Sequence, residues 1–146
     1  MQQFKIFFGF TFLLLLFGCS IPTEFFIQNL TSSKHIIKIN YKKKISNYLI
    51  NDDYGRLSFN YENGILKPGY FNRNKNNFKS LEKTVINDTI IMIEIPANST
   101  TRIEKTHNYS WHWTIKSVEI DNQEYSMEEL GKKAEKKRNN YIYKIE

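Results

Sequence analysis

Short stretches in which apolar and polar residues alternate recur along most of this chain, and they restrict the folds that it can adopt. In residues 35–41, Ile37, Ile39 and Tyr41 occupy every second position. The apolar segment 89–95 ends at Pro96, which lacks the amide donor that a sheet ladder needs. Alternation with a period of two indicates half-buried β-strands.

The same criteria predict further short strands in segments bounded by polar turn residues. They cover residues 25–29, 57–61, 100–104, 109–115, 118–120, 124–125 and 141–145. Asp121 and Asn122, between two of these segments, indicate a hairpin turn. Residues 67–79 are instead rich in Pro, Gly, Asn and Lys, a composition that predicts a long loop.

One helix is predicted near the C-terminus. Ser126 stands at an N-cap position and Glu129 follows three residues later, which is the spacing of a capping box. We expect the helix over residues 127–138, with Met127, Leu130 and Ala134 on its inner stripe.

Many short strands and a single helix favour a mainly β domain, which we expect to be a small antiparallel β-sandwich or barrel with that helix near its C-terminus. A chain of 146 residues has room for one such domain. Its single cysteine excludes an intramolecular disulfide. Residues 27–29 (IQN) and 95–99 (IPANS) also resemble segments of immunoglobulin-like β-sandwich lipoproteins.

The N-terminus has the order of a secretory signal. Lys5 is followed by the apolar run 6–17, then by the small residue Gly18 and by Cys19. An uncleaved membrane anchor is the alternative, but the run is shorter than the roughly 18 apolar residues that a spanning helix needs.

Leu16, Phe17, Gly18 and Cys19 together resemble the lipobox of bacterial lipoproteins, although Phe17 is bulkier than the residue usual at that position. The resemblance implies a diacylglyceryl group on the Cys19 thiol and cleavage between Gly18 and Cys19. Residues 1–18 would then be the signal peptide, 19–24 a lipidated tether and 25–146 the folded domain. Two or more acyl chains would hold the protein firmly to a membrane.

The same resemblance implies a place in the bacterial envelope. Ser20 is not the aspartate that retains such proteins at the inner membrane, so we expect the outer membrane, facing the periplasm. The formal net charge of +6 is spread along the chain, and an envelope location removes access to nucleic acid. The basic residues 42–44 and 132–138 suit either a solvated surface or anionic lipid head groups.

The candidate ligand site is the aromatic segment 109–115. Tyr109, Trp111 and Trp113 either form a platform on which sugars stack, or belong, with Ile115, to the inward face of one strand. His107 and His112 would face opposite sides of a strand, so no metal site is expected.

We therefore expect a non-catalytic, lipid-anchored envelope protein that needs no cofactor and acts through protein–protein contacts. No serine or threonine lies in a recognisable nucleophile motif. The carboxylate pairs 52–53 and 128–129 do not by themselves define a catalytic pair. Two alternatives remain open: a carbohydrate- or peptidoglycan-binding module that uses residues 109–115, and a periplasmic inhibitor or immunity protein.

Overall fold

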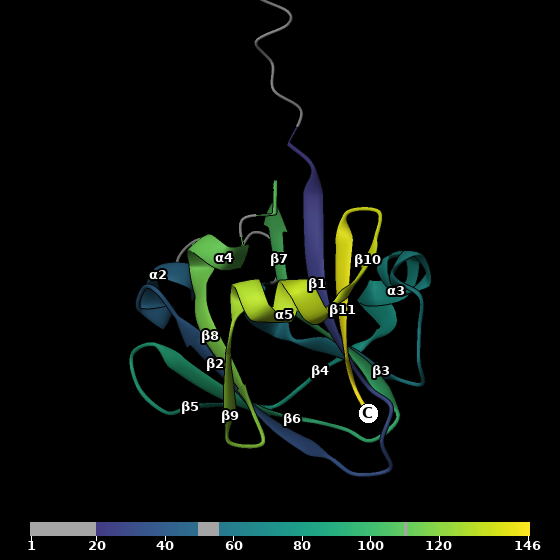
Figure 1. The fold of residues 1–146 in the computed structure, drawn as a ribbon, viewed down its shortest axis with the longest axis horizontal. Helices are drawn as coiled ribbons and strands as arrows, with labels where there is room; N and C mark the ends of the chain where they lie inside the picture. The colour runs from purple at the N-terminus through teal and green to yellow at the C-terminus, as the bar shows by residue number, and fades with distance from the viewer. Residues whose placement is uncertain (1–19, 50–55, 110) are drawn as a thin grey trace, which may run out of the picture.

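Two β-sheets form the body of the protein, and the prediction of a mainly β sandwich is confirmed (Figure 1). The structure is a computed structural model that describes residues 20–49, 56–109 and 111–146. The first sheet has six strands, in the order β10 (Glu135–Lys137), β11 (Asn140–Ile145), β1 (Pro22–Asn29), β7 (Ser99–His107), β3 (Asn60–Asn63) and β4 (Lys79–Ser80). The second has five, in the order β5 (Lys83–Val85), β6 (Ile90–Ile95), β2 (His35–Tyr41), β8 (Ile115–Ile120) and β9 (Gln123–Ser126).

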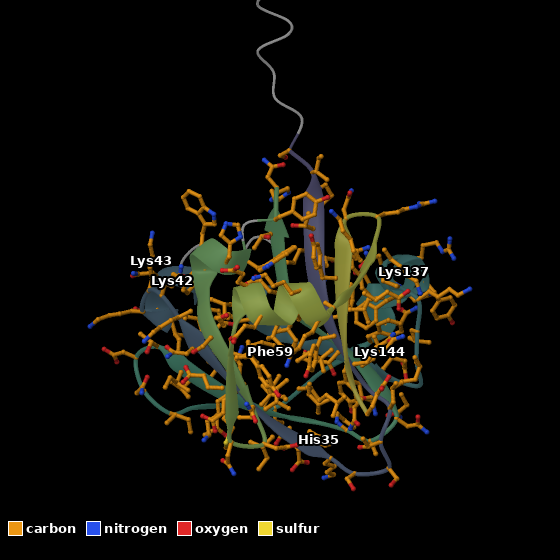
Figure 2. The ribbon with its side chains drawn as sticks, in the orientation of Figure 1. His35, Lys42, Lys43, Phe59, Lys137 and Lys144 are labelled. Carbon is orange, nitrogen blue, oxygen red and sulfur yellow. The ribbon has the colours of Figure 1, made fainter. Side chains whose placement is uncertain are left out.

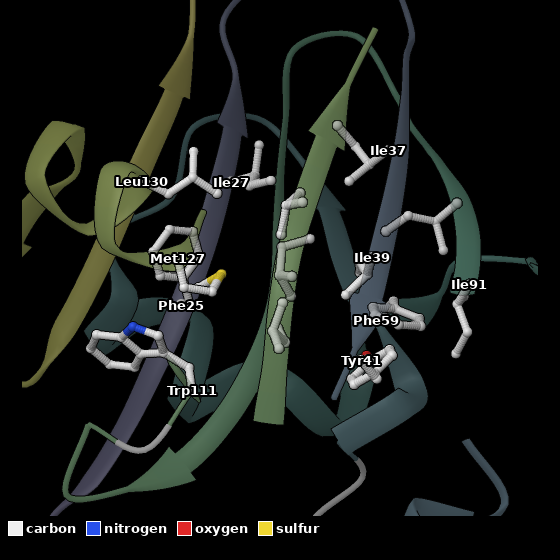
Figure 3. Packing of buried hydrophobic residues seen from close by; sticks show 14 of the residues in the cluster. Phe25, Ile27, Ile37, Ile39, Tyr41, Phe59, Ile91, Trp111, Met127 and Leu130 are labelled. Carbon is white, nitrogen blue, oxygen red and sulfur yellow. The ribbon is translucent and has the colours of Figure 1, made fainter. Parts of the chain in front are cut away.

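The main hydrophobic core lies between the two sheets (Figure 3). Phe25 and Ile27 of the first sheet meet Ile37 and Ile39 of the second, and all four side chains are fully buried. Each large apolar side chain removed from water in this way contributes about 1.5–3 kcal/mol. The alternation in residues 35–41 therefore predicts correctly which side chains of β2 are buried.

Strand β1 is the centre of the first sheet and is buried on both faces. It pairs antiparallel with β7 and parallel with β11, so the first sheet is not purely antiparallel. On the face away from the main core, Phe26 packs edge-on against Phe71 of the helix α3 (Pro68–Asn74). The strand begins at Pro22 rather than at residue 25, so residues 22–24, which were expected in a tether, belong to the sheet.

The prediction of a long loop over residues 67–79 is wrong, because helix α3 lies within this segment. Pro68 stands in the first helical turn, where its missing amide costs nothing, and a 3₁₀ turn, η2 (Lys75–Asn77), follows. Phe71 is fully buried between Phe26 and Phe78. A tertiary contact therefore stabilises this helix, and local composition does not reveal it.

The predicted start of the helix 127–138 is correct, but its predicted end is wrong. Helix α5 (Met127–Lys133) begins with the capping box expected of Ser126 and Glu129, but Ala134 is already extended. Residues 135–137 then pair with β11 as strand β10. The hairpin with β11 ends the helix one turn earlier than propensity suggests.

Three short helices complete the fold: α2 (Ile45–Leu49), η1 (Arg56–Ser58) and α4 (Trp111–Thr114). The strand expected over 57–61 begins only at Asn60, after η1. No helix in the described part of the chain is long and apolar enough to cross a bilayer.

The sandwich has two distinct ends. At the proximal end, β1 begins at Pro22, β7 ends at His107 and the β10–β11 turn lies close by (Figure 1). At the distal end, β1 ends at Asn29 and β2 begins at His35, which Figure 2 shows at the opposite pole from the chain entry.

Candidate functional site

The segment from Tyr109 to Ile115 does not form the predicted strand. Asn108 and Tyr109 have left-handed backbone angles, with φ of 52° and 60°, which turn the chain away from the β7 ladder. Trp111–Thr114 then forms the single turn of α4, and β8 starts only at Ile115. Because a helical turn does not place alternate residues on one face, the aromatic side chains diverge.

The two tryptophans have opposite environments. Trp111 is 5% exposed and packs edge-on against Phe25 and Tyr141, with ring centroids 6.0 and 4.4 Å away. Trp113 is 71% exposed. Tyr109 lies against Trp111 and Tyr141, and its ring is covered by the Lys136 ammonium at 4.9 Å. The three rings therefore do not share one surface on which a sugar could stack.

The histidines bring no metal set together. His107 ends β7, and His112 lies exposed on α4 beside Trp113. No group of three His, Cys, Asp or Glu side chains in the described ranges is placed to hold a metal ion.

The side chains of Thr31, His35 and Asp121 meet at the distal end. No local pattern in the sequence predicts this contact. Thr31 Oγ1 lies 2.8 Å from Nε2 of His35, and Nδ1 of His35 contacts Asp121. This is the order of groups in a nucleophilic triad. Asp121 is 86 residues from His35 in the sequence. The sequence places Asp121 in a hairpin turn, but nothing in it predicts the contact with His35.

The surrounding hydrogen bonds give this trio a structural role. The Thr31 hydroxyl donates to Asn29 Oδ1 at 2.8 Å and accepts from the Ser33 amide at 3.2 Å. Asp121 Oδ1 also accepts from the Ile36 amide. None of the trio lines the groove described next. The three side chains therefore join the β1–β2 turn to the β8–β9 hairpin.

A groove of about 710 Å³ is the first candidate contact surface. We call it the distal groove. It runs over the outer face of β2 and β6, at the point where the chain passes from edge strand β4 to edge strand β5. Its walls are mixed in character and are formed by Lys34, Ile36, Tyr61, Lys79, Ser80, Leu81, Glu82, Thr84, Met92, Ile93, Glu94 and Pro96.

Apolar and charged contacts alternate along this groove. Ile36 is 49% exposed although it lies in a well-paired strand. Beside it, Lys34 and Glu94 form an exposed ion pair at 2.6 Å, and the hydrogen bond with Glu94 raises the pKa of Lys34. Exposed apolar area rimmed by charge is typical of a surface that receives a protein partner.

The remaining sequence-predicted residues divide into two groups. Gly18, Cys19 and the carboxylate pair 52–53 lie outside the described residues. Glu129 caps α5, and hydrogen bonds from Ser126 lower its pKa, while Glu128 pairs with Lys132 on the same helix. These two carboxylates make these contacts within α5 and its N-cap, and so contribute to the stability of that helix.

Comparison of the chain with protein-family models, with curated proteins and with solved structures finds no match.

Proposed function

We propose that this chain is a non-catalytic lipoprotein of the bacterial envelope, anchored by acylated Cys19 and acting through protein contacts at the distal groove. The observation that carries the proposal is the position of Cys19 in a lipobox-like sequence, three positions before Pro22, where β1 begins. Three residues span at most about 10 Å. An acylated Cys19 would hold the proximal end of the sandwich close to the membrane surface.

With the proximal end anchored in this way, the distal groove would lie away from the membrane. β1 has eight residues and runs from the proximal to the distal end, so it spans about 26 Å at the usual rise of a strand. A groove at the distal end would be open to proteins of the periplasm. A small anchored domain with its contact surface at the free end suits a binding role.

The different environments of Tyr109, Trp111 and Trp113 argue against a carbohydrate-binding module that uses residues 109–115. Trp111 belongs to the core, and Trp113 stands by itself on α4. Nothing in the geometry favours an inhibitor or immunity protein over other binding proteins.

Affinity purification from crosslinked envelopes tests the contact role. We expect a stoichiometric partner that is lost in Ile36→Glu, because the substitution replaces an exposed apolar side chain of the groove lining by a charge. Ile65→Glu is the matched control, since Ile65 is 42% exposed and lies outside the groove lining. A partner retained equally by both variants would exclude the groove, and the absence of any partner would count against a role in protein contacts.

A further inference from the structure

A second cavity, of about 340 Å³, opens at the proximal end. We call it the cationic pocket. Four segments that are distant in sequence form it: the start of β1, helix α3 with η2, the end of β7 and the β10–β11 turn. Lys75, Lys105 and Arg138 line it together with Glu24 and Asn72.

Glu24, the single carboxylate of the pocket lining, forms an ion pair with Arg102. Glu24 Oε1 lies 3.5 Å from the Arg102 guanidinium, and both side chains are almost completely buried. Glu24 Oε2 accepts a hydrogen bond from the Asn72 side-chain amide. Arg102 in turn donates to Ser58 and Asn60, which fixes its position under the pocket.

Besides its pair with Arg102, Glu24 also attracts Lys105, which favours the charged form of that lysine. Lys75 and Arg138 form no ion pair with any residue in the described ranges. Burial lowers the pKa of Lys105, and repulsion from Lys75 lowers it further. An anion between these groups would relieve that repulsion, because opposite charges within a few ångströms favour the protonated ammonium.

The position of Arg138 also favours an anion in this pocket. It sits in the β10–β11 turn with a φ of 57°, a backbone conformation that favours glycine or asparagine. Its neighbour Lys137 projects from the same hairpin but is paired with Glu135 at 2.9 Å. The hairpin thus presents one unpaired guanidinium to the pocket, and a guanidinium is well suited to bidentate binding of phosphate oxygens.

We propose that the cationic pocket binds a phosphate group, and that in the cell this group is the head group of an anionic phospholipid. The phosphate site depends only on the residues of the pocket. The lipid as its source rests on the proposed anchoring at Cys19, which would bring the proximal end within about 10 Å of the membrane surface. A head group held there would fix the orientation of the domain on the bilayer.

Phosphate binding is tested first, with the mature protein in a neutral maltoside detergent. We expect inorganic phosphate to bind saturably in calorimetry and to raise the Tm, since a ligand of the folded state stabilises it, whereas sodium chloride of equal ionic strength does not. Arg138→Gly should weaken phosphate binding by about tenfold or more, through loss of a charge-assisted hydrogen bond. Without phosphate, its Tm should be unchanged or higher, because glycine is favoured at this φ.

Lys137→Gln is the matched control, because it removes a cation from the same hairpin without touching the pocket lining. If Arg138→Gly itself perturbs folding, Lys75→Gln provides the second variant and should also weaken phosphate binding. The phosphate site is overturned if no saturable binding occurs, or if the control loses as much affinity as the pocket variants.

The source of the phosphate is tested by doping the micelles with phosphatidylglycerol or, separately, with phosphatidylcholine. Competition by phosphatidylglycerol against inorganic phosphate supports a lipid head group. Phosphate binding without such competition supports the pocket but overturns the lipid assignment in favour of free phosphate. None of these measurements requires acylation of Cys19, so a failure of the anchor and a failure of the pocket are distinguishable.

Discussion

Among single residues, Glu24 and Arg102 form an ion pair in which both side chains are almost completely buried. Removing one partner of a buried pair leaves the other charge without compensation. We predict that Arg102→Met lowers the free energy of unfolding by about 3–5 kcal/mol, measured by urea denaturation. The contrasting variant is Lys132→Met, which removes an exposed pair with Glu128 and should change stability little. Equal effects of the two substitutions would refute the buried role of Arg102.

The two tryptophans provide the second residue-level prediction. Trp111→Ala should destabilise the domain by about 3–5 kcal/mol, as expected when a large aromatic leaves a packed core. Trp113→Ala should leave the unfolding midpoint nearly unchanged, because its indole is 71% exposed. A soluble quencher should reduce most of the fluorescence of Trp113 and little of that of Trp111, which single-tryptophan variants would report. Equal quenching would contradict the separation of the two rings.

At the scale of elements, the start of α5 predicts a pH dependence. Ser126→Ala should cost about 0.5–2 kcal/mol, the usual value of an N-cap. The pKa of Glu129 is lowered by its hydrogen bonds with Ser126. Its contribution is therefore complete above the ordinary glutamate pKa and is lost as the pH falls through the lowered value. Urea denaturation across the acidic range should show this loss in the native chain and a smaller one in Ser126→Ala.

The elements also show what the sequence could and could not predict. Strand β2, the β8–β9 hairpin, β11 and the α5 cap were predicted because their signals are local: alternation, turn residues and capping spacing. Helix α3 was missed, because its stability comes from the contact of Phe71 with Phe26, which lies 45 positions earlier. The end of α5 was misplaced, because pairing with β11 competes with helix propensity after Ala134.

The candidate surfaces were less predictable than the strands. The distal groove combines residues of β2, β3, β4, β5 and β6, and the cationic pocket combines four separate segments. The basic residues 132–138 are evident in the sequence and suit anionic head groups, but no local pattern predicts that Arg138 lines one pocket with Lys75 and Lys105. Contacts of this kind depend on strand order and register, which no local pattern specifies.

At the scale of the whole molecule, the two ends differ in the ligands they suit. The proximal end holds the cationic pocket, and Figure 2 shows Lys42, Lys43 and Lys137 on the half of the molecule nearer the chain entry. The distal end holds a groove of mixed apolar and charged character. Under the proposed anchoring, the first end would face lipid and the second would face the periplasm, with β1 connecting the two.

Acylation of Cys19 underlies the proposed function, and the intact mass of the protein purified from detergent-solubilised envelopes reports it. We expect the mass of residues 19–146 increased by a diacylglyceryl group, with or without a third acyl chain. Cys19→Ser should abolish that increase. An unacylated chain, whether it keeps residues 1–18 or has been cleaved at another position, would refute the lipid anchor.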